Sequence, residues 1–459
     1  MKKQIPFVVI LGGLVFATAC ATTVSRSTGT PGPTPSKKPF IQNSSPVTSA
    51  HSEEPSGVIS LDDALQAALK RHPSLAAAWH EIKAREGAAR QAGLLSNPSL
   101  TGEFEEFGGS GDYSGTDLMS SKIGISQEFS LGGKRAKRVL AANAERDLSV
   151  LERTDQIIAL RTEVKKRFDR VYILQEKLKL EQENLRLVQA SGDAVSKRVS
   201  SGEASPLDET KIAVELASSS VAVERVRREL DAARYALASS WAGETPTFVE
   251  VRADYSMVSD LPSENELLEN IKLNPACRIL EKKVALASAS FDLAQAEAWM
   301  DIEIGGGIQQ FEETDDHAYF VEFSIPFPLF DRNQGGIQEA RETVNKATKK
   351  QEAGMLELKK TLIETSKRLN SVQYAFLAMQ NTVLPAAEKA FISVQKGYMA
   401  GEQDYLEFIA AQRILLETRQ EQLELLAEVQ ELRAELDRLT AESLHGDEDS
   451  ARLSVIGNQ

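Results

Sequence analysis

The residues that could do chemistry in this chain are few and widely separated. Its two cysteines, Cys20 and Cys277, lie far apart in different surroundings, so the sequence predicts neither a disulfide nor a paired-cysteine metal motif. No nucleophile–base pair or phosphate-binding glycine loop is present, so we expect no enzyme and no cofactor. The histidines show no pair at metal-ligand spacing and give little support to a zinc site; they are His51, His72, His80, His317 and His445.

Two carboxylates stand out by their position. Asp208 and Glu407 each follow, by six residues, a glycine (Gly202 or Gly401) that we expect in a turn between helices. Carboxylates that converge on a narrow passage attract cations and repel one another. Ordinary solvated charges are also favoured in the first turn of a helix by its dipole, and Pro206 just before Asp208 fits that alternative. Both interpretations stay open here.

The N-terminus has the pattern of an export signal. Lys2 and Lys3 precede an apolar run that is too short to span a membrane comfortably. Ala17-Thr18-Ala19-Cys20 resembles a bacterial lipobox, in which the cysteine becomes the acylated first residue; ordinary cleavage after Ala19 is the alternative. We therefore expect a signal peptide over 1–19, lipidation at Cys20, and a flexible linker rich in Ser, Thr, Pro and Gly over 20–57.

The charge balance restricts the partners. The chain has 67 acidic and 53 basic residues and a formal net charge of −14. A nucleic-acid-binding protein would present a basic face, so this balance argues against nucleic acid. An acidic surface is compatible with a path for cations, although it also simply promotes solubility.

The chain repeats itself after Gly57. Leu65–Pro73 has a counterpart in Leu267–Pro275, and Ser201-Gly202-Glu203 has one in Ala400-Gly401-Glu402, at an offset near two hundred residues. Such similarity predicts a tandem duplication. We expect a first repeat over 58–260 (repeat 1), a second over 261–444 (repeat 2) and a charged tail over 445–459.

Each repeat begins with a predicted helix, Leu61–Gly93 or Glu264–Met300, and continues with two strands. The strands alternate apolar and polar residues and are long enough to cross a bilayer when tilted. A soluble sheet packed on helices is the alternative, but Glu128, Glu303 and Glu322 then need water on the polar face. The predicted strands are Ser99–Phe107, Lys122–Leu131, Asp301–Phe311 and His317–Phe327. Aromatic residues that could form interfacial belts are Phe104, Phe107, Phe129, Tyr319, Phe323 and Phe327.

The remaining segments are predicted to be very long helices in antiparallel coiled-coil pairs. Lys134–Ser200 contains no proline, and Ile337–Met399 contains Pro385 as an expected kink. The returning helices are expected over Pro206–Ala242 and Gln403–Leu444. Four strands cannot close a barrel, and an open sheet edge in lipid is very costly, so a membrane sheet requires oligomerisation. Three copies would supply twelve strands.

This order of elements resembles the TolC-type outer-membrane factor family, most closely its heavy-metal-efflux (CzcC/CusC-like) branch. The most specific stretches are Ala92–Pro98 before the first strand, Gln127–Arg135 after the second, and Ile325–Asn333 at the equivalent place in repeat 2. The resemblance covers 59–444 and includes the glycine turns.

The resemblance implies a mainly α fold with a membrane β-barrel portion, in a homotrimer with a twelve-stranded barrel in the outer membrane of a Gram-negative bacterium and a helical tunnel in the periplasm. The turns at Gly202 and Gly401 would contact a periplasmic adaptor (membrane fusion protein), which couples to an inner-membrane RND pump. In this family acidic residues narrow the closed tip; Glu407 matches one such position, whereas Ala410 stands where another can lie. Asp208 is the equivalent candidate in repeat 1.

The function implied is a passive exit duct for heavy-metal cations in a tripartite efflux system. A multidrug or type I secretion duct is the first alternative, because the pump usually selects the cargo. A periplasmic coiled-coil scaffold or adaptor is the alternative from another class, but an adaptor would carry a lipoyl-like or small barrel domain, which the sequence lacks.

Overall fold

A computed structural model describes residues 54–255 and 261–440. All the described residues belong to one compact unit. The expected signal peptide, Cys20, most of the 20–57 linker and the 445–459 tail lie outside the described residues.

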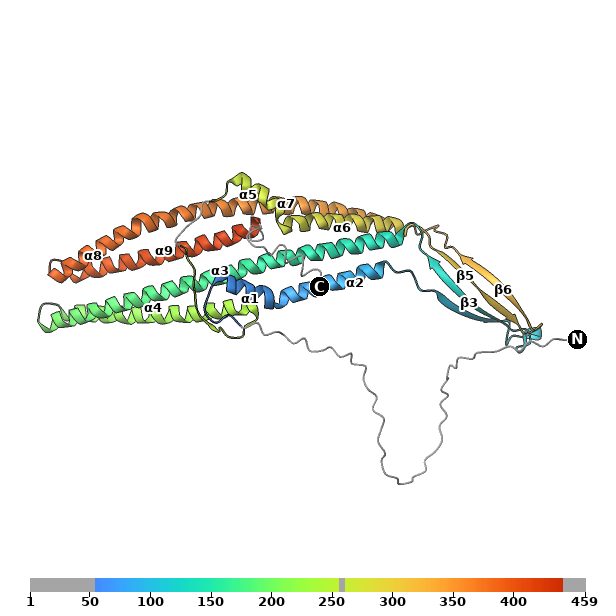
Figure 1. The fold of residues 1–459 in the computed structure, drawn as a ribbon, viewed down its shortest axis with the longest axis horizontal. Coiled ribbons are helices and arrows are strands. Elements are labelled where there is room, and N and C mark those ends of the chain that lie inside the picture. The colour runs from blue at the N-terminus through green and yellow to red at the C-terminus, as the bar shows by residue number, and fades with distance from the viewer. Residues whose placement is uncertain (1–53, 256–260, 441–459) are drawn as a thin grey trace, which may run out of the picture. The chain divides into compact units, whose positions relative to one another are not determined.

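Repeat 1 contains two short helices, a strand pair and a long helical hairpin (Figure 1). Its elements are β1 (Gly57–Ile59), α1 (Leu61–Arg71), α2 (Pro73–Ala92), β2 (Ser99–Glu105), η1 (Gly111–Tyr113), β3 (Ser120–Phe129), α3 (Lys134–Ser200), α4 (Pro206–Ala238), η2 (Ser239–Trp241) and β4 (Phe248–Val251).

Repeat 2 follows the same order. Its elements are α5 (Glu264–Asn270), η3 (Ile271–Leu273), α6 (Pro275–Glu297), β5 (Ile302–Phe311), β6 (Asp316–Ser324), α7 (Gln334–Ala378), a π-helical turn (Met379–Val383), α8 (Leu384–Ala400) and α9 (Tyr405–Thr440).

The opening helix of each repeat is interrupted, which corrects the prediction of single helices over Leu61–Gly93 and Glu264–Met300. The break falls at His72 in repeat 1 and around Asn274 in repeat 2. Each of these residues precedes a proline, which disfavours helical backbone at the residue before it and fits the first position of a new helix. Both side chains then cap the new helix, since they accept a hydrogen bond from the backbone two residues later.

The long helices match the sequence prediction closely. At 67 residues, α3 extends roughly 100 Å, because an α-helix rises 1.5 Å per residue. The kink expected at Pro385 takes the form of the π-helical turn Met379–Val383 just before it. Proline has no N–H to donate and its ring crowds the carbonyl four residues earlier, so the preceding turn widens.

The four predicted strands form one antiparallel sheet in the order β2-β3-β5-β6. The repeats therefore meet at the β3–β5 pair, and the outer edges of β2 and β6 have no partner strand within the part of the chain that the structure describes. The observed β6 ends at Ser324, three residues before the predicted end at Phe327.

A small parallel sheet of β1 and β4 was not predicted. It brings the start of repeat 1 beside its end and covers a core that contains the fully buried Trp241, Phe168 and Leu237. A second core forms in repeat 2 around Leu267, Ile271, Leu362, Leu369 and Val429.

In the helical part, α3 packs against α4 and α9, and α9 packs against α8, which leaves α4 and α8 as the outer helices (Figure 1). The turn ends of the two hairpins have their own small cores, one around Val188, Val195 and Ile212 and one around Phe391, Phe408 and Leu415. Within the described ranges, none of the helices combines the length and the apolar character needed to cross a membrane.

Candidate functional site

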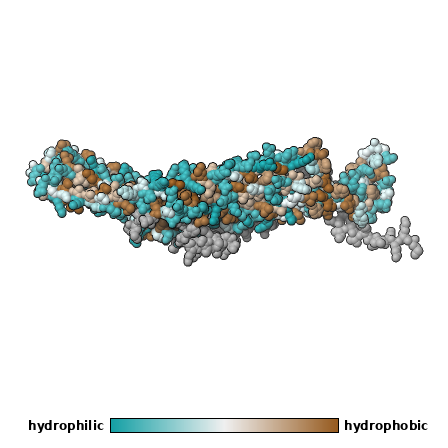
Figure 2. Space-filling model, turned by 90° about the horizontal axis from the view of Figure 1, so that it is seen from above, coloured by the Kyte–Doolittle hydropathy of each residue, from teal (hydrophilic) through white to brown (hydrophobic). Residues whose placement is uncertain are grey.

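One face of the four-stranded sheet is apolar and exposed. The register aligns Leu100 with Ile125, Gly306 and Val321, and Ile123 with Ile308 and Tyr319. Val321 is 83% exposed and Tyr319 79% exposed. Hydrophobic residues also gather where the helices meet the sheet, whereas the helical surface is mainly hydrophilic (Figure 2). The alternation predicted from the sequence is confirmed by this register.

The opposite face of the sheet is polar and rich in carboxylates. The Lys122 ammonium lies 2.7 Å from a Glu105 oxygen and 3.4 Å from a Glu103 oxygen. The Ser126 hydroxyl donates to Glu303 at 2.6 Å, and Glu303 is directly opposite Glu128. Repeated carboxylates are tolerated on such a face only where water solvates them. The arrangement therefore suits a wall with an apolar outside and a water-filled, acidic inside.

Two aromatic residues interrupt the polar face, Phe311 at the end of β5 and Phe320 near the middle of β6. Phe320 is half-buried, and its Cζ would lie 2.9 Å from a Cβ added to Gly124. Glycine at this position leaves the space that the ring occupies, since any side chain would collide with it. The alternation along β6 puts Phe320 on the same face as Glu322.

The junction between the sheet and the long helices is tied by polar contacts between the repeats. Lys134 at the start of α3 pairs with Asp301 at 2.7 Å, and Asp301 also accepts a hydrogen bond from the Leu131 backbone at 3.1 Å. A cleft of about 850 Å³ opens here between polar side chains and exposed apolar ones. Phe327 and Phe330 beside it are 78% and 90% exposed.

The helical hairpins turn at the two glycines that the sequence indicated. Gly202 and Gly401 have φ of 83° and 79°, a left-handed conformation that costs other residues free energy. Behind each turn a backbone hydrogen bond closes the helix end, from Glu203 to Arg198 at 2.8 Å and from Glu402 to Gly397 at 2.9 Å. The two turns are thus structural equivalents.

The two candidate gate carboxylates differ in environment. Asp208 is half-buried and pairs with Lys211 at 3.3 Å, one turn along α4. Glu407 is exposed in the first turn of α9, where its backbone N–H donates to the Asp404 side chain at 2.8 Å. No contact joins Asp208 and Glu407 among the described residues. Their roles remain predictions.

An aromatic cluster at the same end was not predicted from the sequence. The Tyr398 and Phe408 rings stack with centroids 5.0 Å apart, and the Arg198 guanidinium lies 5.3 Å from the Tyr398 centroid. Tyr405 packs on the apolar core of the other hairpin, and burial raises the pKa of Tyr405 to about 12. The only signal in the sequence is that Tyr398 and Tyr405 flank Gly401.

A buried carboxyl lies farther along α3. Asp169 accepts a hydrogen bond from the Tyr255 hydroxyl, and burial raises the pKa of Asp169 to about 6. Its second carboxylate oxygen has no hydrogen-bond partner. Burial also raises the pKa of Tyr255, whose ring contacts Tyr172 edge-on at 5.0 Å. The group links α3 to the segment that joins the repeats.

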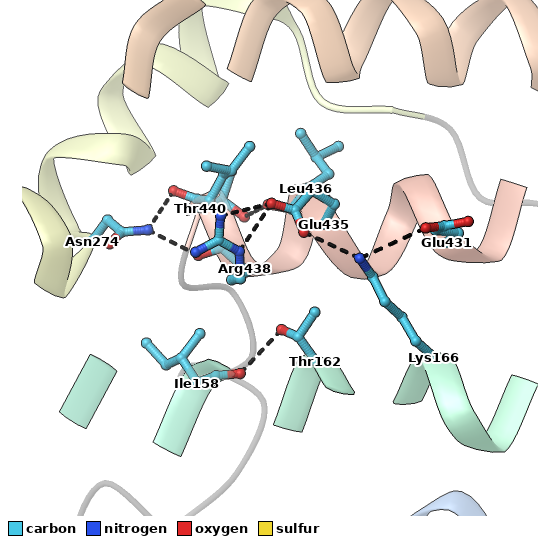
Figure 3. A network of polar contacts seen from close by, with 10 residues as sticks. Ile158, Thr162, Lys166, Asn274, Glu431, Glu435, Leu436, Arg438 and Thr440 are labelled. Atoms are coloured by element: carbon cyan, nitrogen blue, oxygen red, sulfur yellow. Dashed lines mark hydrogen bonds and ion pairs between the residues drawn. The ribbon is translucent and has the colours of Figure 1, made fainter. Parts of the chain in front are cut away.

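The far end of α9 is held by polar contacts to residues of both repeats (Figure 3). The Asn274 amide donates to the carbonyls of Arg438 and Leu439, both at 2.8 Å. Lys166 of α3 pairs with Glu435 at 3.3 Å. Asn274 thus satisfies backbone carbonyls that a helix end leaves without partners.

No group of three or more His, Cys, Asp or Glu side chains is arranged to hold a metal ion within the described ranges. The buried Cys277 thiol instead donates to the Ile271 carbonyl at 3.2 Å.

Comparison with known proteins identifies this arrangement. The sequence pattern of the outer membrane efflux protein family matches residues 64–243 and 268–442, most of both repeats. The chain belongs to this family. This outer membrane efflux protein therefore acts in efflux and is located in the outer membrane.

Among characterised relatives, the chain is 28% identical to the cobalt-zinc-cadmium resistance protein CzcC of Cupriavidus metallidurans, over 84% of this chain and 91% of that one. It is 25% identical to the nickel-cobalt-cadmium resistance protein NccC of Alcaligenes xylosoxydans, over 61% of this chain and 63% of that one.

Solved structures share the fold at low identity. The outer membrane protein VceC of Vibrio cholerae superposes with a TM-score of 0.68 at 19% identity, over 83% of this chain and 95% of that one. The CusC channel superposes with a TM-score of 0.71 at 19% identity, over 83% of this chain and 91% of that one.

Proposed function

We propose that this efflux protein is one subunit of a homotrimeric exit duct for heavy-metal cations, in a tripartite system with a periplasmic adaptor and an inner-membrane RND pump. The observation that carries the proposal is the four-stranded sheet with two unlike faces and two edges that have no partner strand among the described residues. It performs no catalysis and needs no cofactor in this proposal.

The unpaired edges support a closed oligomer. Each unsatisfied backbone group in lipid costs several kcal/mol, so a membrane sheet must close on itself. Three copies would provide twelve strands with the apolar face toward lipid and the carboxylate face toward a water-filled pore.

The cargo is proposed from two independent supports. The relatives CzcC, NccC and CnrC are named for resistance to cobalt, zinc, cadmium or nickel. The polar face carries Glu103, Glu105, Glu128, Glu303 and Glu322. A pore lined in this way concentrates cations and repels anions.

The ends of the molecule have proposed roles as well. The turns at Gly202 and Gly401 would contact the adaptor, because they are exposed, are defined in conformation and lie at the ends of the helical hairpins away from the four-stranded sheet (Figure 1). Cys20 would carry a lipid anchor. Mass spectrometry of the mature N-terminus tests this, and an unmodified Cys20 would remove the lipid from the proposal.

Deletion of the gene and complementation test the cargo. The deletion strain would be challenged separately with cobalt, zinc, cadmium, nickel, copper and several hydrophobic drugs, with cell metal content measured. We expect raised content and sensitivity for one or more of the metals, restored by the intact gene. Unchanged metal content with raised drug sensitivity would instead indicate a multidrug duct.

Glu407 is the proposed gate residue, since its carboxylate is exposed at the second turn and has no ion-pair partner among the described side chains. Glu407→Gln should change single-channel conductance and cation selectivity in planar bilayers, because a ring of three charges is removed. Glu421→Gln is the matched control, since Glu421 is also exposed on α9 but far from the turn. Identical currents for both variants would rule out a gating role.

A further inference from the structure

The two repeats contact each other through one pair of strands and through the long helix α3 of repeat 1, which packs on both α6 and α9 of repeat 2. Strand β3 of repeat 1 pairs with β5 of repeat 2, and helix α3 of repeat 1 packs on α9 of repeat 2. The equivalent second contact would join β6 to β2 and α8 to α4. These four elements form the outer edges of the described chain, so another copy must supply the partners.

The strands of the two repeats can be aligned residue by residue. A Ser-x-x-Phe-x-Leu pattern occurs as Ser126–Leu131 at the end of β3 and as Ser324–Leu329 at the end of β6. Ser126 lies opposite Ser99, and Ser324 lies opposite Glu303. Ser99 is therefore the equivalent of Glu303, and the equivalence continues along both strands. It matches Leu100 to Ile304, Gly102 to Gly306 and Phe104 to Ile308.

The observed β3–β5 register then gives the register expected for the equivalent pair, β6 with β2 of another copy. In the β3–β5 pair, Ile123 lies opposite Ile308, and Ile125 lies opposite Gly306. Replacing each residue by its equivalent in the other repeat gives the pairs for β6 and β2. These pairs are Val321 with Phe104, Phe323 with Gly102, and Ile325 with Leu100.

We propose that β6 of one copy pairs with β2 of a neighbouring copy in this register, Val321 opposite Phe104 and Ile325 opposite Leu100. The proposal rests on the proposed trimer and adds the residues that close it. The direction agrees, because three antiparallel steps separate β2 from β6 and leave them running in opposite senses.

The two faces of the sheet provide an independent check. Val321 and Phe323 lie on the exposed apolar face of β6, and Phe104 and Leu100 lie on the apolar face of β2. The derived register joins apolar to apolar. A slip by one residue would bring Val321 opposite Glu103. Apolar side chains of one copy would then share a face with the carboxylates of the other, which is unfavourable in a sheet with one apolar and one polar face.

The end of β6 provides a second check. Apolar alternation continues in the sequence through Ile325 and Phe327, although the strand ends at Ser324. In the derived register Ile325 has a partner in Leu100, so β6 lengthens when a second copy is present. The strand predicted to Phe327 from the sequence then gains the hydrogen bonds that the isolated chain does not provide.

The same replacement of residues by their equivalents can be applied to the junction just beyond the strands. Asp301, just before β5, accepts a hydrogen bond from the Leu131 backbone just after β3. The equivalents are Asn97, just before β2, and Leu329, just after β6. In the single chain the Leu329 N–H donates to the Phe327 carbonyl at 2.8 Å, and we expect it to donate to the Asn97 side chain of a neighbouring copy instead when β6 lengthens. The exposed segment beside Phe327 and Phe330 would become a contact between copies.

One pair in this register is electrostatically unfavourable. Glu322 falls opposite Glu103 of the neighbouring copy, and like charges directly opposite one another destabilise a sheet. Lys122 of that copy already lies 3.4 Å from its Glu103, on the water-facing side, and reduces this repulsion.

Cysteine cross-linking of the full-length, detergent-purified protein tests the register. In a Cys277→Ala background, the pair Phe104→Cys and Val321→Cys should oxidise to covalent dimers and trimers, because a disulfide requires Cβ atoms about 4 Å apart. The matched control pairs Val321→Cys with Glu103→Cys, whose side chain lies on the opposite face. It should remain uncross-linked, as should the background chain.

A second pair and a mass measurement separate the possible results. Leu100→Cys with Ile325→Cys should also cross-link, and Thr101→Cys with Ile325→Cys should not. The mass of each unoxidised variant shows whether trimers form. Trimers that cross-link through the control pairs, or through none, would overturn the register and leave the proposed function intact. A parent chain that is monomeric in the outer membrane would overturn both.

Discussion

Asp169 places a titratable carboxyl inside the helical region, where its charge is poorly solvated. Its side chain is 5% exposed, and burial outweighs both the Tyr255 hydrogen bond and the attraction of Lys165, while Asp437 of α9 adds a repulsion. The pKa of Asp169 therefore rises from 3.8 to about 6. A group whose pKa is higher in the folded state favours folding at low pH, and this benefit is lost as pH rises from about 4 through 6.

Asp169→Asn should remove this dependence. Because the amide cannot ionise, we expect the variant to gain stability relative to the parent as pH rises from 4 to 7.5. The gain should reach about 2–3 kcal/mol at most, since one pKa unit corresponds to about 1.4 kcal/mol. Thermal unfolding of both proteins across that pH range would measure it. Tyr255→Phe is the control: losing this donor raises the pKa of Asp169 further and steepens the dependence. A variant that follows the parent at every pH would contradict the assignment.

Some residues of the candidate site were predictable and others were not. Gly202 and Gly401 could be recognised because each stands at the matching place of a repeated turn. Asp169 could not, because its burial depends on Tyr255, which is 86 residues away in the chain. The Arg198–Tyr398 contact likewise joins two hairpins from different repeats, and local sequence carries no signal for it.

At the scale of elements, the turns depend on glycine for a conformational reason. Gly202→Ala and Gly401→Ala should each lower stability by about 1 kcal/mol, because an L-residue in the left-handed region costs 1–2 kcal/mol. No atom lies within 4 Å of a Cβ built at either position, so the cost is backbone strain rather than collision. Thermal midpoints of the purified variants and the parent protein would measure the loss.

Gly192 provides the matched control for those turns. It lies in the interior of α3, and a Cβ there would meet Ile212 Cγ1 at an ordinary distance of 3.7 Å. Gly192→Ala should therefore be neutral or stabilise by up to about 1 kcal/mol, the difference in helix propensity. Equal losses at Gly192 and Gly202 would show that the turn conformation is not the cause.

Elements were predictable where a single local rule decides them. The bounds of α3 match the prediction at both ends, because glycines precede it, a glycine turn follows it and its interior lacks proline. The β1–β4 pair was missed because strands of three and four residues show no usable period and lie about 190 residues apart. The observed β6 ends at Ser324 rather than at the predicted Phe327, because a strand extends only where another strand pairs with it.

At the scale of the whole molecule, the sequence predicted the order helix, hairpin, long helix pair in duplicate, and the fold confirms it. The residues that close the assembly could not be obtained from the sequence alone. They depend on the observed β3–β5 register, which aligns strands about 180 residues apart. Once that register is known, the duplication predicts the proposed contact between copies.

The charge on the polar face makes a prediction for the assembled channel. Glu303→Gln combined with Glu322→Gln would remove six negative charges from a trimeric pore, and we expect cation selectivity to fall. Reversal potentials in planar bilayers under a salt gradient would measure it. The loss should be largest at low salt, because screening at 0.1 M already limits the reach of each charge to about 10 Å. Glu244→Gln, an exposed carboxylate in the segment between η2 and β4, is the control. A reversal potential that stayed at the parent value in both variants would mean that the carboxylate face does not line the ion path, and that the apolar face is not the one that contacts lipid.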